Sequence, residues 1–193
     1  MNYSNLLENK IAEIKAKGEK PRLLLHACCA PCSSYVLEYL REHFDITLYF
    51  YNPNISPEKE YIFRQAELIR LVGEMGLPIT VITEKYSPEE FFEVSKGLEK
   101  EPEGGERCFK CYRLRLLKTA EYAKKNGFQF FTTTLSISPY KNAEKLNEIG
   151  AIEDFIDKTV AVEQGDTKKS VVVEAEIIVV NAMTHLYMTT TLS

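Results

Sequence analysis

The chain has 193 residues and a formal net charge of −4, with 45% hydrophobic and 27% charged residues. This length and balance are typical of one globular domain with a buried core, and they exclude a low-complexity chain or a strongly basic nucleic-acid-binding chain. The five cysteines all precede residue 112, and their odd number argues against a disulfide scaffold. We therefore interpret them as reactive or metal-binding thiols in a reducing compartment.

The predicted elements alternate between helix and strand along the first 150 residues. Apolar residues at helical spacing predict a first helix over residues 3–17, which ends at Gly18. Short apolar runs predict strands over residues 23–27, 46–51, 78–82 and 128–135. The periodic segments between and after them predict helices that begin near residue 33, span 57–75, begin at 87, span 109–125 and begin at 138. This alternation predicts a three-layer α/β domain with a mainly parallel sheet.

We treat residues 1–193 as a single domain with an N-terminal helix (1–18), a core (20–150) and an atypical tail (151–193). Beyond residue 155 the tail contains no Pro, Cys or Arg, and Tyr187 is its one aromatic residue. Its apolar runs at 171–173 and 177–180 have the composition of strands but lack turn signals, so the sequence does not place them.

No segment of the sequence has the features of a membrane or export signal. The N-terminus lacks a basic region followed by an apolar run, and no stretch approaches the roughly 20 apolar residues of a membrane helix. We therefore expect a cytoplasmic protein without a membrane partner.

The strongest functional signal is a group of cysteines at the edge of the predicted sheet. Ligands of such sheets bind beyond the carboxyl ends of the strands, so we expect a metal site there. The segment His26–Ser33 follows the first strand, and a second cysteine pair opens a later helix; the thiols are those of Cys28, Cys29, Cys32, Cys108 and Cys111. Helix N-termini favour anions and lower thiol pKa values. Three cysteines within five residues argue against the alternative of buried structural thiols.

Three kinds of site compete for these thiols. A structural zinc ion needs four ligands in tetrahedral geometry, which adjacent cysteines supply poorly because their side chains normally point apart. An iron–sulfur cluster is wider and offers separate iron corners, which relaxes that constraint. A thiol–disulfide site would use Cys29 and Cys32 at a helix N-terminus and would need no metal.

Four segments carry a resemblance to a known family. They are the run from Leu23 to Ser33, residues 51–55 with Glu60, Tyr61 and Arg64, residues 97–112 around the second cysteine pair, and residues 132–142. Over about residues 20 to 150 these long motifs resemble the cobalamin-independent epoxyqueuosine reductase family (QueH).

The resemblance implies a Rossmann-like fold, a cofactor and a reaction. A [4Fe-4S] cluster would be bound by Cys28, Cys29, Cys108 and Cys111, and Cys32 would ligate an additional adjacent iron. The reaction would be the reductive removal of the epoxide oxygen of epoxyqueuosine in tRNA, which gives queuosine. It consumes two electrons and two protons and releases water, so it also requires an electron donor.

The tail departs from the family pattern. Members usually end in an aromatic-rich segment that carries Cys-Gly-Cys, whereas this chain has no cysteine after Cys111. Either the tail has diverged or a frameshift has replaced it, and a role that needs a C-terminal dithiol is therefore not assigned to this chain.

The reaction also needs a general acid for the leaving oxygen. Tyr140 and Lys141 follow the fourth predicted strand and are our candidates for proton donation or substrate positioning. The alternative is a helix start with Ser138 as the N-cap and Pro139 in the first turn, and we prefer this role for those two residues.

Several polar residues at the same edge have structural explanations. We expect His26 to be a hydrogen-bonded core histidine rather than a ligand. Turn chemistry around Pro53 explains Asn52 and Asn54, and β-branched strand packing explains Thr132–Thr134. Contacts to a substrate, including its ribose or phosphate, are the alternative for both groups.

Local charge suggests a nucleic-acid contact that the net charge hides. The segment from Arg107 to Lys125 contains seven basic residues and one acidic residue, Glu121. The dipole at the helix C-terminus explains the two terminal lysines but not the earlier cations, for which we predict contacts with tRNA phosphates: Arg107, Lys110, Arg113 and Arg115. Phe109 and Tyr112 are candidates for stacking on an unpaired base.

Three other functions are alternatives to an iron–sulfur tRNA-modifying reductase. A thiol–disulfide oxidoreductase using Cys29 and Cys32 would contain no metal, and a zinc-stabilised RNA-binding module would be colourless and would unfold with a chelator. An ATP-dependent tRNA thiolation enzyme would share the fold, but the first strand here leads into cysteines and not into a glycine-rich phosphate loop.

Overall fold

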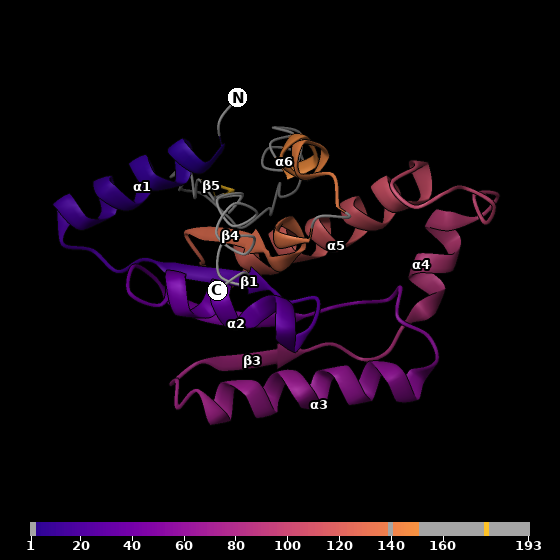
Figure 1. The fold of residues 1–193 in the computed structure, drawn as a ribbon, viewed down its shortest axis with the longest axis horizontal. Coiled ribbons are helices and arrows are strands. Elements are labelled where there is room, and N and C mark those ends of the chain that lie inside the picture. The colour runs from indigo at the N-terminus through magenta and orange to yellow at the C-terminus, as the bar shows by residue number, and fades with distance from the viewer. Residues whose placement is uncertain (1–2, 139–140, 151–175, 178–193) are drawn as a thin grey trace, which may run out of the picture.

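The computed structural model describes residues 3–138, 141–150 and 176–177 (Figure 1). Its strands are β1 (Arg22–His26), β2 (Asp45–Phe50), β3 (Thr80–Thr83), β4 (Phe130–Thr133) and β5 (Glu176–Ile177). Its helices are α1 (Tyr3–Lys17), α2 (Ala30–Leu40), α3 (Glu58–Glu74), α4 (Pro88–Ser95), α5 (Glu106–Lys125) and α6 (Ala143–Gly150), with a 3-10 turn, η1, at Thr134–Ile137. In the described ranges no helix is long and apolar enough to cross a membrane.

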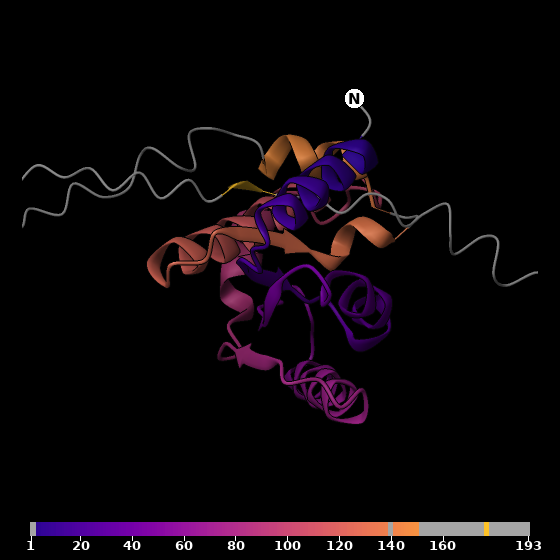
Figure 2. The same cartoon turned by 90° about the vertical axis from the view of Figure 1, so that its left-hand side faces the viewer.

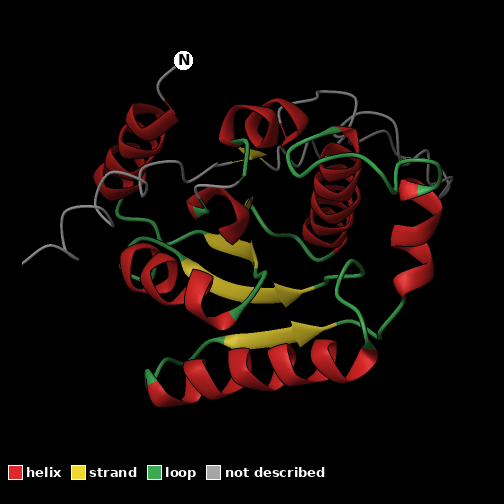
Figure 3. Cartoon of the chain, turned by 45° about the vertical axis from the view of Figure 1, so that its right-hand side comes forward, coloured by secondary structure: helices red, strands yellow, loops and turns green. Residues whose placement is uncertain are grey.

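The strands form one parallel sheet, in the order β3-β2-β1-β4-β5. In the central strand β1, Leu25 lies opposite Leu48 of β2 and Thr132 of β4. Because all pairs are parallel, all carboxyl ends lie at one edge, and the arrows of Figure 3 point together toward the side that carries α4. The predicted α/β fold with a mainly parallel sheet is confirmed.

Helices cover both faces of the sheet, as Figures 1 and 2 show. Side chains alternate across a strand, so neighbouring leucines of β1 serve different layers. Leu23 and Leu25 are buried in the core that α1, α2 and α3 form, whereas Leu24 packs in the core that includes α5. This two-sided burial explains why β1 is an uninterrupted apolar run in the sequence.

The predicted element boundaries differ most at the two functional segments. α2 begins at Ala30, three residues before the predicted Ser33, so Cys32 lies in its first turn. α5 begins at Glu106, which places Cys108 inside the helix. Of the tail, only Glu176–Ile177 is described, as a short strand beside β4; the apolar run 171–173 and residues 178–180 lie outside the described residues.

The fourth strand ends two residues earlier than predicted because a side chain turns the backbone. The Thr133 hydroxyl accepts the N–H of Leu135 at 3.1 Å, and the chain then enters η1. The predicted helix start at Ser138 is wrong, since Ser138 is the extended residue that ends η1. α6 begins at Ala143 instead, where the Asn142 side chain accepts the N–H of Lys145 at 2.8 Å. Pro139 and Tyr140 lie outside the described residues.

Thr133 also fixes His26, the last residue of β1. The His26 ring is fully buried, with Nδ1 2.8 Å from the Thr133 hydroxyl and Nε2 3.0 Å from the Tyr51 carbonyl. The carbonyl can only accept, so Nε2 carries the proton and Nδ1 accepts from Thr133. Burial, followed by the charge of Arg115, lowers the pKa of His26 to about 3, which keeps the ring neutral. The predicted core histidine is confirmed.

Replacing Thr133 should therefore destabilise the protein far more than the same change one residue earlier. Thr133→Val keeps the volume but leaves His26 Nδ1 and the Leu135 N–H unpaired, which costs about 1–3 kcal/mol. Thr132 is equally buried, but its hydroxyl has no hydrogen-bond partner among the described residues, so Thr132→Val should be neutral or stabilising. Chemical denaturation of both variants measures the difference, and equal free energies of unfolding would contradict this account.

Candidate functional site

Two loop-to-helix junctions bring all five cysteines to one cavity at the carboxyl edge of the sheet. Cys28 and Cys29 follow β1, Cys32 lies in the first turn of α2, and Cys108 and Cys111 lie in the first two turns of α5. All five line a cavity of about 410 Å³, which we call the thiol cavity. The other polar or charged lining residues include Asn52, Asn54, Arg64, Arg107, Arg115 and Lys141.

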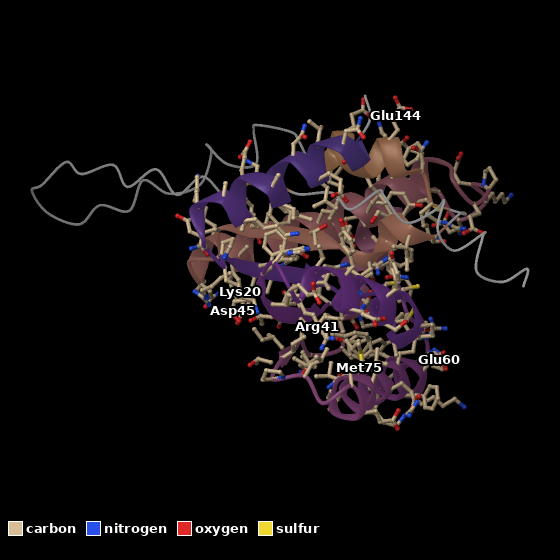
Figure 4. The ribbon with its side chains drawn as sticks, turned by 60° about the vertical axis from the view of Figure 1, so that its left-hand side comes forward. Lys20, Arg41, Asp45, Glu60, Met75 and Glu144 are labelled. Atoms are coloured by element: carbon tan, nitrogen blue, oxygen red, sulfur yellow. The ribbon has the colours of Figure 1, made fainter. Side chains whose placement is uncertain are left out.

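The thiol cavity lies far from the opposite edge of the sheet. Figure 4 shows Lys20, two residues before β1, and Asp45, the first residue of β2, at one end of the molecule and Glu60, in the first turn of α3, at the other. Cys28 and Cys29 directly follow the carboxyl end of β1, which agrees with the predicted placement of the cysteine site.

Three of the thiols form a tight group. The Sγ atoms of Cys28, Cys29 and Cys32 lie within 4.8 Å of one another, close enough to share one metal ion. The Sγ atoms of the adjacent pair Cys28 and Cys29 are 3.8 Å apart, so the expectation that they point apart is wrong here. Cys29 is the N-cap of α2 and has extended backbone, so this pair spans the junction between the end of β1 and the helix.

The second pair lines the same cavity without belonging to this group. Cys111 is buried, and the Cys108 sulfur accepts the N–H of Gly104 at 3.3 Å. The structure thus gathers all five predicted thiols at one cavity. The tight group, however, consists of Cys28, Cys29 and Cys32, whereas the ligand set implied by the resemblance pairs Cys28 and Cys29 with Cys108 and Cys111.

The surroundings of Cys28 favour its ionised form. Hydrogen bonding with the thiols of Cys29 and Cys32 lowers the pKa of Cys28 well below its usual range, and the Arg115 charge and the Thr134 hydroxyl act in the same direction. The pKa values of Cys29 and Cys32 are raised, chiefly by their hydrogen bonding with Cys28.

Thr134, the first residue of η1 after β4, holds Cys28 in place. Its hydroxyl accepts the Cys28 N–H at 3.0 Å and donates to the Cys28 sulfur at 3.2 Å. Thr132, Thr133 and Thr134 are all buried, so they contribute to the interior and not to an open surface for ribose or phosphate. The sequence placed Thr134 among β-branched strand residues, and its hydrogen bonds to Cys28 were not predicted because they depend on the parallel pairing of β1 with β4.

Asn52, which lies after β2, connects the end of β1 with α5. Its amide donates to the Ala27 carbonyl at 2.9 Å, and its side-chain oxygen accepts from the Arg115 guanidinium. Asn52 and Arg115 are only 1% and 4% exposed. The predicted surface role of Arg115 is therefore not what the structure shows: this cation lies in the interior beside the thiol cavity.

The remaining predicted RNA-contact residues lie on two faces of α5. Arg107 lines the thiol cavity and donates to the Glu99 carbonyl at 3.0 Å. Lys110 and Arg113 instead line a second cavity of about 590 Å³, which we call the α4–α6 groove. Its other lining residues include Lys96, Phe109 and Lys145.

The other predicted residues divide in the same way. Phe109 lines the α4–α6 groove, with the Lys145 ammonium 5.5 Å from its ring centroid. Tyr112 is 2% exposed and lines the thiol cavity, so it offers no open ring face for stacking. Lys141 lines the thiol cavity and pairs with Glu103 at 2.9 Å, while Tyr140 lies outside the described residues.

Comparisons with known proteins agree with the cysteine motifs. A profile of the family "Epoxyqueuosine reductase QueH" matches residues 23–190. A relative of that name from Staphylococcus epidermidis is 40% identical over 78% of this chain and 66% of its own length. Relatives from Histophilus somni and Haemophilus influenzae are each 46% identical over 75% of this chain and 61% of their own length.

The chain thus spans slightly less than two thirds of the length of the curated relatives it matches. Among solved structures, an NH3-dependent NAD synthetase from Campylobacter jejuni gives a TM-score of 0.42 at 12% identity, over 69% of this chain and 57% of that chain, which is too weak to support an argument. Because the family profile covers most of the sequence, the chain belongs to the epoxyqueuosine reductase QueH family.

Proposed function

We propose that the protein is an epoxyqueuosine reductase, which removes the epoxide oxygen of epoxyqueuosine in tRNA by a two-electron reduction and gives queuosine. The observation that carries the proposal is the convergence of five thiols on one cavity in a member of this family. An electron donor outside the chain supplies the two electrons, and water is the second product. A tRNA substrate places the protein in the cytoplasm.

The residues of the thiol cavity fit a metal cofactor. Besides its soft thiolate ligands, the cavity is lined by Tyr112 and Arg115, whose buried Oη and Nε atoms have no hydrogen-bond partner within the described structure. Both atoms are donors suited to an anionic group. Cys28, Cys29, Cys108 and Cys111 would hold a [4Fe-4S] cluster, and Cys32 would hold an additional iron.

The chain itself must supply orientation and protons. When bound, the cluster would supply electrons and the additional iron would act as a Lewis acid toward the epoxide. We assign proton donation to Lys141, which lines the cavity and whose ammonium pairs with the exposed carboxylate of Glu103, and we keep Tyr140 as the second candidate. A lysine donor protonates the leaving oxygen directly or positions the group that does.

The α4–α6 groove supports a role for α5 in tRNA binding. Its lining includes four cations, Lys96, Lys110, Arg113 and Lys145, against the two carboxylates of Glu93 and Glu106. Phe109 adds a partly buried aromatic ring to the same lining. Cations beside an aromatic ring suit the phosphates and bases of an RNA loop. Arg107, at the thiol cavity, would contact a phosphate near the reacting nucleoside.

Anaerobic reconstitution with iron and sulfide tests the cofactor. The protein should bind about four irons and four inorganic sulfides per chain in a cluster, with brown absorbance, and one further iron when Cys32 is intact. The loaded protein with a reductant should convert epoxyqueuosine-containing tRNA to queuosine-containing tRNA, measured by mass spectrometry of nucleosides. Cys108→Ala with Cys111→Ala should lose the cluster, whereas Ser34→Ala, at a half-buried position on α2, should keep it.

Two results would contradict this proposal in different ways. Tightly bound zinc without inorganic sulfide would favour the zinc-stabilised RNA-binding module. A redox-active disulfide between Cys29 and Cys32 in metal-free protein would favour the thiol–disulfide oxidoreductase.

Salt-dependent binding tests the RNA surface. Each phosphate neutralised by a cation contributes about −0.9 to the slope of log K against log salt concentration on duplexes, and about −0.7 on single strands. Lys110→Ala with Arg113→Ala should therefore weaken tRNA binding and reduce the magnitude of that slope by between ~1 and ~2. Lys124→Ala with Lys125→Ala removes the same charge at the far end of α5. If both double variants change the slope equally, the α4–α6 groove is not the contact surface.

A further inference from the structure

Arg115 is a buried cation without a carboxylate partner. Its side chain is 4% exposed and lies on the face of α5 that also carries Cys111 and Tyr112. Its one hydrogen bond to a side chain goes to Asn52, its Nε is unpaired, and no acidic residue of the described chain forms an ion pair with it. A guanidinium does not lose its proton in a protein, so this charge must be balanced by another group.

The lining of the thiol cavity contains no carboxylate that could balance Arg115. Besides Arg115, its charged residues are Arg64, Arg107 and Lys141, and all three are cations. Asn52, which binds the guanidinium, is an uncharged amide. A cysteine binds a metal as a thiolate, so the five cysteines of the same lining would supply negative charge when a cluster is bound.

The position of Arg115 is fixed by the same link that fixes the cysteine loop. Asn52 binds the guanidinium with its oxygen and the Ala27 carbonyl with its amide. Ala27 immediately precedes Cys28, so a movement of the cysteine loop would also displace the anchor of the cation. This arrangement is typical of a preorganised charge and not of a mobile surface arginine.

We propose that Arg115 is a positioning residue that supplies the counter-charge of the cysteine site: it stabilises the anionic cluster bound there and raises its reduction potential. The inference rests on the proposed iron–sulfur function. Four thiolates give a [4Fe-4S] centre a net charge that becomes one unit more negative when it accepts an electron. A fixed positive charge in the interior stabilises the reduced state more than the oxidised state, because Coulomb energies are large where water is excluded.

The test compares Arg115→Met, Arg115→Lys and wild type after anaerobic reconstitution, with the reduced cluster followed by electron paramagnetic resonance during a potentiometric titration. Arg115→Met should shift the ratio of reduced to oxidised cluster at least tenfold toward the oxidised form at a given potential, which is about 59 mV for one electron. Arg115→Lys should restore most of the difference. Lys118→Met removes an exposed cation paired with Glu90 on the same helix and should leave the potential unchanged.

Each outcome decides the inference. A wild-type potential in Arg115→Met, or an equal shift in Lys118→Met, overturns it, and so does a variant that keeps the potential but loses only tRNA affinity. If Arg115→Met takes up no cluster, the test becomes cluster uptake by two further variants. The positively charged Arg115→Lys must then take up the cluster, and the neutral Arg115→Gln must not. Uptake by both variants, or by neither, overturns the inference that the charge of Arg115 is what matters. If wild type itself loads no cluster, the proposed function fails, and the two failures are thereby distinguished.

Discussion

The candidate site depends on the buried hydrogen bonds that fix the carboxyl end of β1 between β2 and β4. On one side, two residues that follow β2 form hydrogen bonds to the end of β1. The Tyr51 carbonyl accepts from His26 Nε2, and the Asn52 amide donates to the Ala27 carbonyl. On the other side, Thr133 at the end of β4 binds His26, and Thr134 at the start of η1 binds Cys28. Each bond joins residues distant in sequence, and each lies in a region from which water is excluded, where an unpaired partner is costly.

This network also explains how a reactive loop is tolerated beside a rigid sheet. Cys28 has no regular backbone partner of its own, yet its N–H and its sulfur are both bound by Thr134. One residue earlier, the Ala27 N–H donates to the Tyr49 carbonyl at 2.9 Å, so the backbone leaves the sheet only after its last hydrogen bond has been made. The thiols are therefore presented from a fixed backbone, which is what a metal or a small reacting group requires.

The sequence predicted the elements of the fold well because their signals are local and repeated. A short apolar run such as Leu23–Leu25 has the length of a strand buried on both faces, and Gly18, with φ +65°, ends α1 as predicted. The end of β4 was not predictable in the same way, since one hydrogen bond accepted by the Thr133 side chain decides it. Residue type does not reveal such a bond, because threonine is equally at home inside a strand.

The candidate site was predicted to a different extent for its thiols and for its supporting residues. Cysteine spacing identified all five thiols, whereas the charge run of α5 suggested that Arg115 is a surface residue. Helical spacing contains the correcting signal: Cys111, Arg115 and Thr119 follow one another at intervals of four, and all three are buried. An arginine on the same helical face as a predicted metal ligand is better interpreted as interior than as part of a solvated charge run.

Under the proposed function, α5 would combine two roles that the sequence alone presents as one charged segment. Its buried face carries the second cysteine pair and Arg115, and its other face carries Lys110 and Arg113 into the α4–α6 groove. Since a helix is rigid over a few turns, an RNA loop bound by the outer cations would have a defined position relative to the thiols. The distance from groove to cavity is then set by the diameter of one helix, about 10 Å. A nucleotide extruded from a bound loop would need to pass around the N-terminus of α5, where Arg107 lies at the thiol cavity.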